Sequence, residues 1–282
     1  MNILIVVMIG SVAVLAIALW WGAYRWESET ERMHARLKAG RNSTGSKPYS
    51  SSELVDLPAP VQRYFRAVLT EGQPIVAAVY LEQVGKMNMS VSGESWKPFT
   101  ASQLVITECC GFDWDARIRM LPGLTARVHD AYIAGEGMLQ ASLFGLFSMA
   151  NARGTAEMAH GELLRYFAEA TWYPTALLPS QGVHWKAVDD CSAEATMKDG
   201  ETVATLLFRF DSNGLIASMR AESRARGVDG VLASAPWEGH WSNYEHRGDM
   251  LIPTAGEVAW ILPEGTKTYW RGRITNLRYE FA

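Results

Sequence analysis

The chain has few cysteines for its length, with three among 282 residues. Cys109 and Cys110 are adjacent, and adjacent cysteines rarely pair with each other. At most one disulfide is therefore expected, from Cys191 to Cys109 or Cys110, and the alternative is that all three are ordinary buried thiols. A fold held together by several disulfides is excluded.

The chain also lacks an excess of basic residues. It carries 26 Lys and Arg against 30 Asp and Glu, a net charge of −4, which gives no general attraction to nucleic acid. No sequence signature of an RNA- or DNA-binding fold occurs. Nucleic acid is therefore not an expected partner.

Common catalytic and cofactor motifs are missing as well. Ser180 does not stand in a Gly-x-Ser-x-Gly motif, and the glycines at 135 and 137 lack the Lys-Ser/Thr pair of a phosphate loop. His240 and His246 would lie about 20 Å apart in an extended strand, too far to share a metal ion. The sequence predicts no metal site and no cofactor.

What the chain does have is one long uncharged run near its N-terminus. Residues 3–24 contain no charge, and in a helix they would span the roughly 30 Å hydrocarbon core of a bilayer. Trp20, Trp21 and Tyr24 lie at the end of this run, and such rings prefer the headgroup level. A cleaved signal peptide is the alternative, but the run lacks a basic n-region and a clear small-x-small cleavage site. We predict a single-pass anchor over residues 1–26, in the inner cell membrane.

The residues after this run suggest its orientation. Basic residues follow it and none precedes it, which favours a cytoplasmic domain by the positive-inside rule, and unpaired cysteines agree. An exported domain tethered to the inner membrane is the alternative. Residues 27–54 are expected to form a polar linker, helical to Lys38 and flexible from Asn42 to Ser52, before one globular domain over residues 55–282. The basic residues are Arg25, Arg32, Arg36, Lys38 and Arg41.

From Pro74 onward, apolar residues recur at every second position, the period of a strand with one buried face. In residues 112–120 the apolar set is Phe112, Trp114, Ala116, Ile118 and Met120, and the charged set is Asp113, Asp115, Arg117 and Arg119. Similar segments are 75–90, 99–107, 125–133, 183–188, 202–210, 215–224, 237–246, 250–262 and 268–281. Turn sequences at 198–200 and 211–214 predict hairpins. The expected fold class is mainly β (α+β): about nine to eleven antiparallel strands in one large curved sheet or open barrel, with a few covering helices.

Three stretches of this domain are predicted as helices. Residues 61–69 carry a helical apolar stripe, after a start at 56–60 with Asp56 as the cap. Residues 141–152 are short and largely apolar. Residues 161–171 are amphipathic and end before Pro174, because the residue before a proline avoids the α conformation.

The helix over residues 161–171 also carries the candidate site. Its three charges form a line beside the apolar stripe. They are either a solvent-facing ion-pair stripe or a polar network in a cleft, facing the charged side of the strand over residues 112–120. Two aromatic residues at the helix end are suited to a pocket rim. The candidate ligand-binding residues are Asp115, Arg117, Glu162, Arg165, Glu169, Trp172 and Tyr173.

The chain contains eleven tryptophans. In a curved sheet, inward rings either fill a large core or enclose an apolar cavity for a hydrophobic ligand. The leading hypothesis is a membrane-anchored protein that binds a hydrophobic or amphiphilic ligand such as a lipid. The alternatives are an enzyme with a carboxylate and arginine site in the same cleft, and a scaffold of a membrane complex.

Several stretches resemble a bacterial family of uncharacterised proteins. They are LPAPVQRYFRAVL, GFDWDARIRMLPGL, GELLRYFAEATWYPTALLPSQGV, FRFDSNG, PWEGHWSNYE and YWRGR, and they cover most of residues 57–280. The resemblance implies a single domain and brings no catalytic residues with it. In shape, the expected sheet behind a membrane anchor is also similar to the lipoprotein-carrier type of lipid-binding fold, which is an analogy of fold alone.

Overall fold

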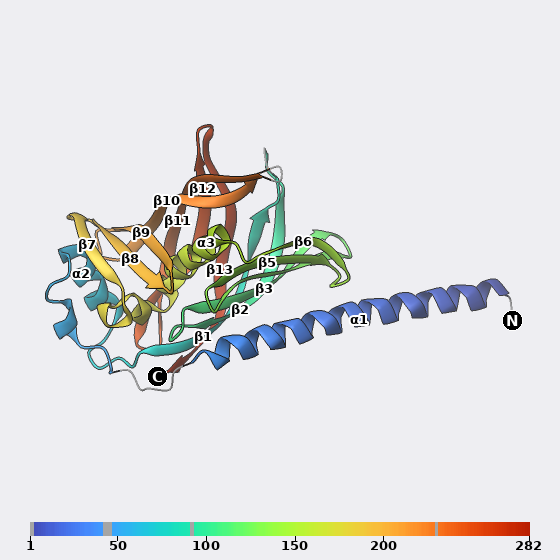
Figure 1. Ribbon diagram of the computed structural model, residues 1–282, viewed down its shortest axis with the longest axis horizontal. Helices are drawn as coiled ribbons and strands as arrows, with labels where there is room; N and C mark the ends of the chain where they lie inside the picture. The colour runs from blue at the N-terminus through green and yellow to red at the C-terminus, as the bar shows by residue number, and fades with distance from the viewer. Residues whose placement is uncertain (1–2, 42–46, 91–92, 229–230) are drawn as a thin grey trace.

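The computed structural model of the protein describes residues 3–41, 47–90, 93–228 and 231–282. Within them, one antiparallel sheet of thirteen strands forms the body of the molecule, and a long N-terminal helix extends from it (Figure 1). The predicted fold class is confirmed, with more strands than the about nine to eleven expected from the period-two segments.

The elements are numbered along the chain. The helices are α1 (Ile3–Ala39), α2 (Ala59–Val68) and α3 (Ala156–Glu169), with short 3-10 turns η1 (Ser51–Leu54), η2 (Ala170–Trp172), η3 (Pro174–Leu177) and η4 (Pro179–Gln181). The strands are β1 (Val76–Asn88), β2 (Trp96–Ile106), β3 (Gly111–Leu121), β4 (Leu124–Ile133), β5 (Glu136–Leu143), β6 (Phe147–Arg153), β7 (His184–Asp189), β8 (Ser192–Asp199), β9 (Thr202–Phe210), β10 (Ile216–Val228), β11 (Val231–Arg247), β12 (Met250–Leu262) and β13 (Gly265–Phe281).

The strand order explains why a helix interrupts a chain of strands. In space the order is β6-β5-β4-β3-β2-β1-β13-β12-β11-β10-β9-β8-β7, and all neighbours are antiparallel. The first and last strands therefore pair in the middle of the sheet, and β6 and β7 are its edges. The chain passes from one edge to the other through α3, which lies in the hollow of the sheet (Figure 1). There α3 contacts β4 and β5 on one side and β9 and β10 on the other.

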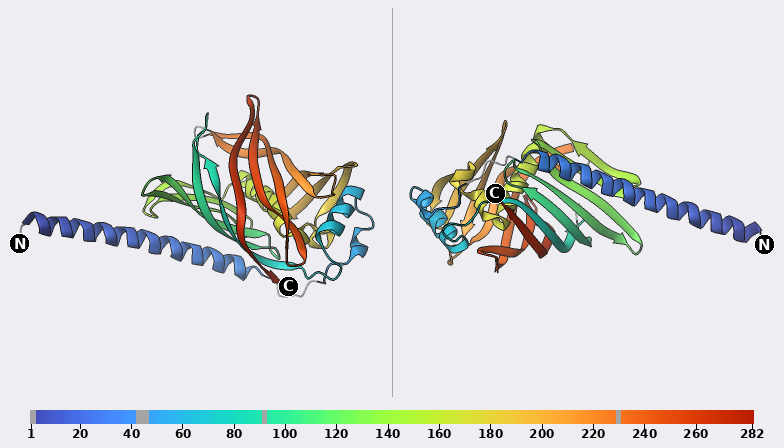
Figure 2. Two further views of the ribbon diagram at one scale, coloured as in Figure 1. Left: turned by 180° about the vertical axis from the view of Figure 1, so that it is seen from behind. Right: turned by 90° about the horizontal axis from the view of Figure 1, so that it is seen from below.

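Three glycines at one level bend the middle of the sheet. Gly85 of β1 pairs with Gly272 of β13, which pairs with Gly256 of β12. A side chain at any of them would meet an aromatic ring: Phe99 at position 85, Trp270 at 272 and Trp241 at 256. The rings occupy the space that the glycines leave open, and this glycine row permits the strong curvature visible in Figure 2.

Helix α1 has two parts with different surroundings. Its apolar N-terminal part extends away from the sheet, whereas Trp26, Met33 and Leu37 are buried against the convex face (Figure 2). The helix is long and apolar enough to cross a membrane, and a signal sequence would meet the same criteria. The predicted linker therefore begins inside a helix whose last turns pack on the domain. Its expected flexible tether falls partly on residues 42–46, outside the described residues.

Four local predictions differ from the structure. Residues 141–152 are not a helix but parts of β5 and β6, joined by a turn in which Phe144 and Gly145 have positive φ angles of 56° and 73°. Periodicity does not separate helix from strand in a short apolar run, and the pairing of β5 with β4 decides between them.

The N-cap of α2 is Pro58 rather than Asp56, and α3 begins five residues earlier than expected. The three cysteines, all within the described residues, are free, as the thiol alternative expected, but Cys191 is exposed rather than buried.

Candidate functional site

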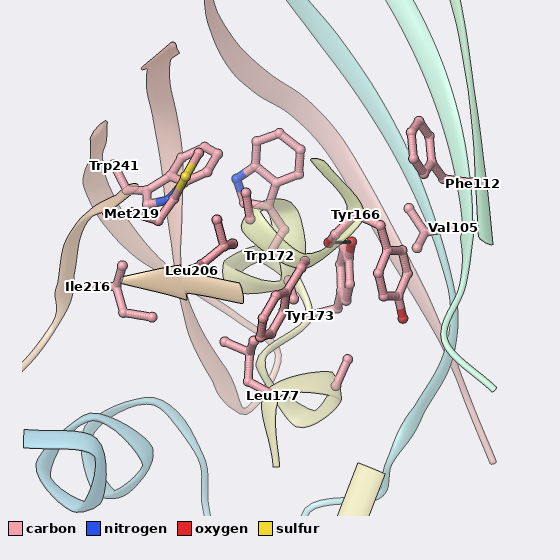
Figure 3. Close-up of a cluster of buried hydrophobic side chains, with 14 of the residues drawn as sticks. Val105, Phe112, Tyr166, Trp172, Tyr173, Leu177, Leu206, Ile216, Met219 and Trp241 are labelled. Carbon is pink, nitrogen blue, oxygen red and sulfur yellow. Dashed lines mark hydrogen bonds between the residues drawn. The ribbon is translucent and has the colours of Figure 1, made fainter. Parts of the chain in front are cut away.

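The concave side of the sheet holds a small cavity of about 80 Å³. It lies where α3 and η2 face the middle strands, and its aromatic walls are Trp114, Trp172, Trp237, Trp241, Tyr269 and Trp270. Small-molecule sites usually measure about 300–1,000 Å³. Side chains therefore fill most of the concave interior, as Figure 3 shows around Trp172 and Trp241, whose ring centroids lie 5.2 Å apart. The space that remains suits only part of a ligand.

Five charged side chains lie at or directly beside this cavity, and we call them the buried ion cluster: Asp130 of β4, Glu162, Arg165 and Glu169 of α3, and Arg224 of β10. Nη1 of Arg165 lies 2.6 Å from Oδ2 of Asp130, and its Nε lies 2.8 Å from Oε1 of Glu169. Nη2 of Arg224 lies 3.2 Å from Oε1 of Glu162. The cluster thus ties α3 to strands in both halves of the sheet.

Both arginines of the cluster lie over aromatic rings. The guanidinium carbon of Arg165 is 4.9 Å from the ring centroid of Phe112 and 5.1 Å from that of Trp114. The guanidinium carbon of Arg224 is 4.5 Å from the ring centroid of Trp237. A desolvated cation over a ring is stabilised by about 2 kcal/mol. The aromatic walls therefore hold the two cations in place beside the cavity.

Several polar atoms at this site have no hydrogen-bond partner among the described residues. Three are donors, Nε1 of Trp172, Nε1 of Trp241 and Nε of Arg224. Two are carboxyl oxygens, Oδ1 of Asp130 and Oε2 of Glu162, and these two groups can hydrogen-bond to each other when Glu162 is protonated. A buried polar atom without a partner costs about 1–3 kcal/mol, and such atoms are rare in native proteins. The three donors belong to residues that line the cavity.

The protonation of Glu162 decides which charge faces the cavity. Burial, together with the nearby charge of Asp130, raises the pKa of Glu162 to about 8. Arg224 and Arg165 oppose this shift, but the loss of hydration is larger. The raised pKa weakens the charge pairing between Glu162 and Arg224 at their contact. Glu162 does not line the cavity, whereas Arg224 does.

Four of the predicted residues meet at this site: Glu162, Arg165, Glu169 and Trp172. The charged line of α3 faces the sheet, so the solvent-facing alternative is wrong. Tyr173 is buried beside them, where its hydroxyl donates to the carbonyl oxygen of Tyr166 at 2.8 Å, but it does not line the cavity.

Asp115 and Arg117 lie on the other face of the sheet. Oδ1 of Asp115 accepts a hydrogen bond from Nε1 of Trp26 in α1 at 2.9 Å, and Arg117 is exposed. The expected network between these two residues and the charges of α3 is therefore wrong. Helix α3 packs on the apolar side of β3, and α1 covers its charged side.

That charged side forms a second buried network, between α1 and the sheet. Nδ1 of His129 lies 2.8 Å from Oδ1 of Asp113, and Nε2 of His34 lies 3.2 Å from Oδ2 of the same aspartate. The ring of Trp26 stacks on the ring of His129, with centroids 4.5 Å apart. Burial alone would raise the pKa of Asp113, but His129 and His34 lower it below its usual value. Burial alone would lower the pKa of His129, but the bond to Asp113 raises it. The two groups form an ion pair that helps to hold α1.

Sequence reasoning missed three residues of the site: Asp130, Arg224 and Gln103, whose Nε2 donates to Oε2 of Glu169 at 2.6 Å. Arg224 follows a β-bulge, since the register of β10 shifts between Ala221 and Arg224. Before the bulge the inward-facing residues have odd numbers, and after it they have even numbers, so the alternation did not identify Arg224 as inward-facing. Asp130 could have been identified from the sequence. It stands at an inward position of β4, where the alternation predicts an apolar residue.

Comparisons with known proteins give a family and two distant likenesses. No curated protein matches the chain. A LolA superfamily protein from Nitrosomonas europaea is similar over 79% of this chain and 93% of its own, at 11% identity and a TM-score of 0.36. A β-barrel-like protein of the domain of unknown function DUF1849 from Brucella abortus is similar over 73% of this chain and 99% of its own, at 9% identity and a TM-score of 0.26. Likenesses this distant say nothing about what the cavity binds.

The sequence profile of one family covers most of the chain, from residue 55 to residue 279. These residues include α2, α3, nearly the whole sheet and every residue of the buried ion cluster. The chain therefore belongs to the family of unknown function DUF6920.

Proposed function

We propose that this protein is a membrane-anchored binding protein whose concave cavity takes the polar end of an amphiphilic ligand. The observation that carries the proposal is a set of three donors without a partner among the described residues, on Trp172, Trp241 and Arg224, all of which line the cavity. A carboxylate or similar anion would accept hydrogen bonds from them and offset the charge of Arg224.

The walls of the cavity support an amphiphile rather than a fully polar ligand. Besides the tryptophan rings, Met87, Met219 and Val258 line it. Apolar carbons next to the polar end of the ligand would contact these side chains and lose their contact with water. This burial stabilises the complex by about 25 cal/mol for each Å² of apolar surface buried. With about 80 Å³ available, the cavity takes the polar end and a few carbons, and the rest of a long chain stays outside it.

A catalytic role for the same carboxylates has less support. Glu169 is held by Arg165 and Gln103, and Glu162 lies behind Arg224 without lining the cavity. Glu169 lines the cavity, but both of its oxygens accept hydrogen bonds from protein groups. The raised pKa of Glu162 would suit a general acid, but its carboxyl group does not reach the lining. Binding is therefore the function that the geometry favours.

The membrane part of the proposal rests on α1. Its apolar part is exposed, whereas its last turns are packed on the sheet through Trp26, Met33 and Leu37. Cleavage of the kind that removes a signal sequence would cut a continuous helix next to these contacts. We therefore take α1 as an uncleaved anchor in a bilayer, with residues 3–24 in the membrane.

A substitution in the cavity wall tests the binding proposal. In the full chain, Trp241→Phe removes an unpaired donor and keeps the six-membered ring, so we expect the lost packing to be partly offset and thermal stability to fall only modestly. Binding of octanoate, measured by equilibrium dialysis, should weaken about tenfold or more, since a hydrogen bond to a charged group contributes about 1.5–3 kcal/mol. Octanol, which lacks the charge, should bind more weakly than octanoate.

Trp185→Phe is the matched control. Trp185 donates to the carbonyl oxygen of Leu177 and lies outside the cavity, so its substitution should leave octanoate binding as it is. The proposal fails if octanoate does not bind to the unchanged protein, or if both substitutions affect its binding equally.

A further inference from the structure

The tip of the β5–β6 hairpin lies directly against α1 at Gly22. A Cβ atom at Gly22 would lie 2.7 Å from Cγ of Leu146, and one at Gly145 would lie 2.9 Å from the backbone carbon of Gly22. Each glycine thus permits the approach of the other segment. The position of this tip along α1 is therefore fixed by contact.

This contact lies at a particular level of α1. Gly22 stands among Trp20, Trp21 and Tyr24, at the end of the apolar part. Such rings collect at the headgroup level of a bilayer, and the residues from Ile3 to Trp21 span about 28 Å as a helix, close to the thickness of a hydrocarbon core. If this part of α1 crosses a membrane, as proposed above, the hairpin tip lies at the membrane surface.

The same end of the sheet exposes apolar side chains. Phe147 and Met149 of β6 are 65% and 54% exposed, and Leu121, the last residue of β3, is 59% exposed. The amide of Phe144 donates to the carbonyl oxygen of Thr125, which joins the hairpin tip to the start of β4. The β5–β6 turn ends beside the middle of α1, and the β3–β4 turn lies at the same end of the sheet (Figures 1 and 2).

Arginines are also present at this end of the sheet. Arg117 and Arg119 are exposed on the last residues of β3, and Arg117 lies opposite Arg127 of β4. Like charges on opposite residues of paired strands repel each other. Arg25 and Arg32 of α1 line a hollow of about 100 Å³ at the hairpin tip, together with Glu29, which pairs with Arg32. This positive rim is complementary to anionic lipid headgroups.

We propose that this end of the sheet, the β3–β4 turn with Leu121 and the β5–β6 tip with Phe147, docks on an anionic bilayer surface beside α1. The apolar side chains enter the headgroup region, and the arginines contact lipid phosphates. The domain then makes two contacts with the membrane, so it cannot swing freely about α1. The occupant of the surface is a lipid bilayer, and its position follows from the proposed span of α1.

Photocrosslinking of the full chain in lipid vesicles tests this docking. Phe147→p-benzoylphenylalanine places a probe of similar shape at the tip. The matched control is Phe281→p-benzoylphenylalanine, since Phe281 is also exposed, at 45%. It lies next to Glu280, which pairs with Arg41 at the far end of α1, about 30 Å along the helix from Trp21. We expect lipid adducts, detected by mass spectrometry, at position 147 and not at position 281.

A third probe separates this proposal from the anchoring of α1. Val12→p-benzoylphenylalanine lies in the middle of the apolar part and should give lipid adducts if α1 spans the bilayer. Adducts at position 12 without an excess at position 147 over position 281 would overturn the docking and leave the anchor intact. Adducts at neither position would overturn both.

The lipid composition tests the role of charge. In vesicles of phosphatidylcholine mixed with phosphatidylglycerol, Arg119→Gln should lower the adduct yield at position 147 about fivefold, because an arginine near an anionic surface contributes about 1 kcal/mol. In vesicles of phosphatidylcholine alone, the same substitution should change the yield little. An equal effect in both would contradict the electrostatic part of the proposal.

Discussion

At the residue scale, Arg165 is the side chain on which the buried ion cluster depends most. It is the common partner of Asp130 and Glu169 and packs against the rings of Phe112 and Trp114. Two carboxylates in the hollow of the sheet therefore share one cation. Removing one member of a buried ion pair costs much more than removing an exposed pair, because the remaining charge has lost its hydration.

We predict that Arg165→Met destabilises the domain by about 3–5 kcal/mol, because it leaves carboxylates without their cation. Chemical denaturation of the full chain in detergent measures this loss. Arg220→Met is the control, since Arg220 pairs with Glu222 on the surface and its loss should cost at most about 1 kcal/mol. Equal effects of the two substitutions would show that the cluster does not have the energetic role assigned to it.

At the element scale, the sequence predicted the strands best where the alternation is unbroken. The bounds of β9 and β12 are those expected from residues 202–210 and 250–262. Prediction failed where apolar and polar residues alternate only weakly, and where pairing with another strand, rather than the local sequence, determines the secondary structure. Strand β8 is rich in small residues that give a weak pattern, and β5 and β6 are strands because they pair with β4 and with each other.

The site was partly predictable for the same reason. The charges of α3 stand out on a helix, and they were found from their spacing. Their partners come from strands distant in sequence, and no local pattern connects Arg224 with Glu162. The bulge before Arg224 removed the remaining signal, because a single extra residue reverses which positions face inward.

Also at the element scale, we predict that the attachment of α1 weakens as the pH rises. The pKa of His129 is raised in the folded protein, so its pairing with Asp113 stabilises the fold fully below about pH 6.5 and less as the pH rises through its folded pKa. The pKa of Asp113 is lowered, so its contribution is lost only in acid. The thermal midpoint of the full chain should therefore fall as the pH rises above about 6.5. Buried Glu162, whose pKa is raised to about 8, adds to this fall up to about pH 8, because it keeps its proton in the folded protein while the unfolded chain ionises.

Asp113→Asn should lower this midpoint and make it less dependent on pH in that range. His240→Gln is the control, because His240 pairs with Glu238 on the surface, and it should keep the dependence of the unchanged protein. A pH dependence that Asp113→Asn leaves unaltered would exclude the pair between His129 and Asp113 as its origin.

At the scale of the whole molecule, one chain path produces both the cavity and its covering. Because the first and last strands pair in the middle, the crossing between the two edges has to pass over one face of the sheet, and α3 makes that crossing. The glycine row curves the sheet around it. The opposite face is left for α1, so the cavity and the proposed membrane anchor lie on different faces of the same strands.

The side of the membrane on which this domain lies is a prediction at the same scale. Five basic residues between Arg25 and Arg41 follow the apolar part of α1, and none precedes it, so the domain should be cytoplasmic by the positive-inside rule.

Cys191 is an exposed native thiol that can report the side on which the domain lies. A hydrogen bond to Asp189 raises its pKa, so labelling is best done in mildly alkaline buffer. With the chain expressed in a bacterium, a maleimide reagent that does not cross membranes should modify Cys191 in lysed spheroplasts and not in intact ones, and the Cys191→Ser variant should lose this modification. Equal modification in intact spheroplasts would place the domain outside the cytoplasm, with the arginines of its membrane-facing end at the outer leaflet.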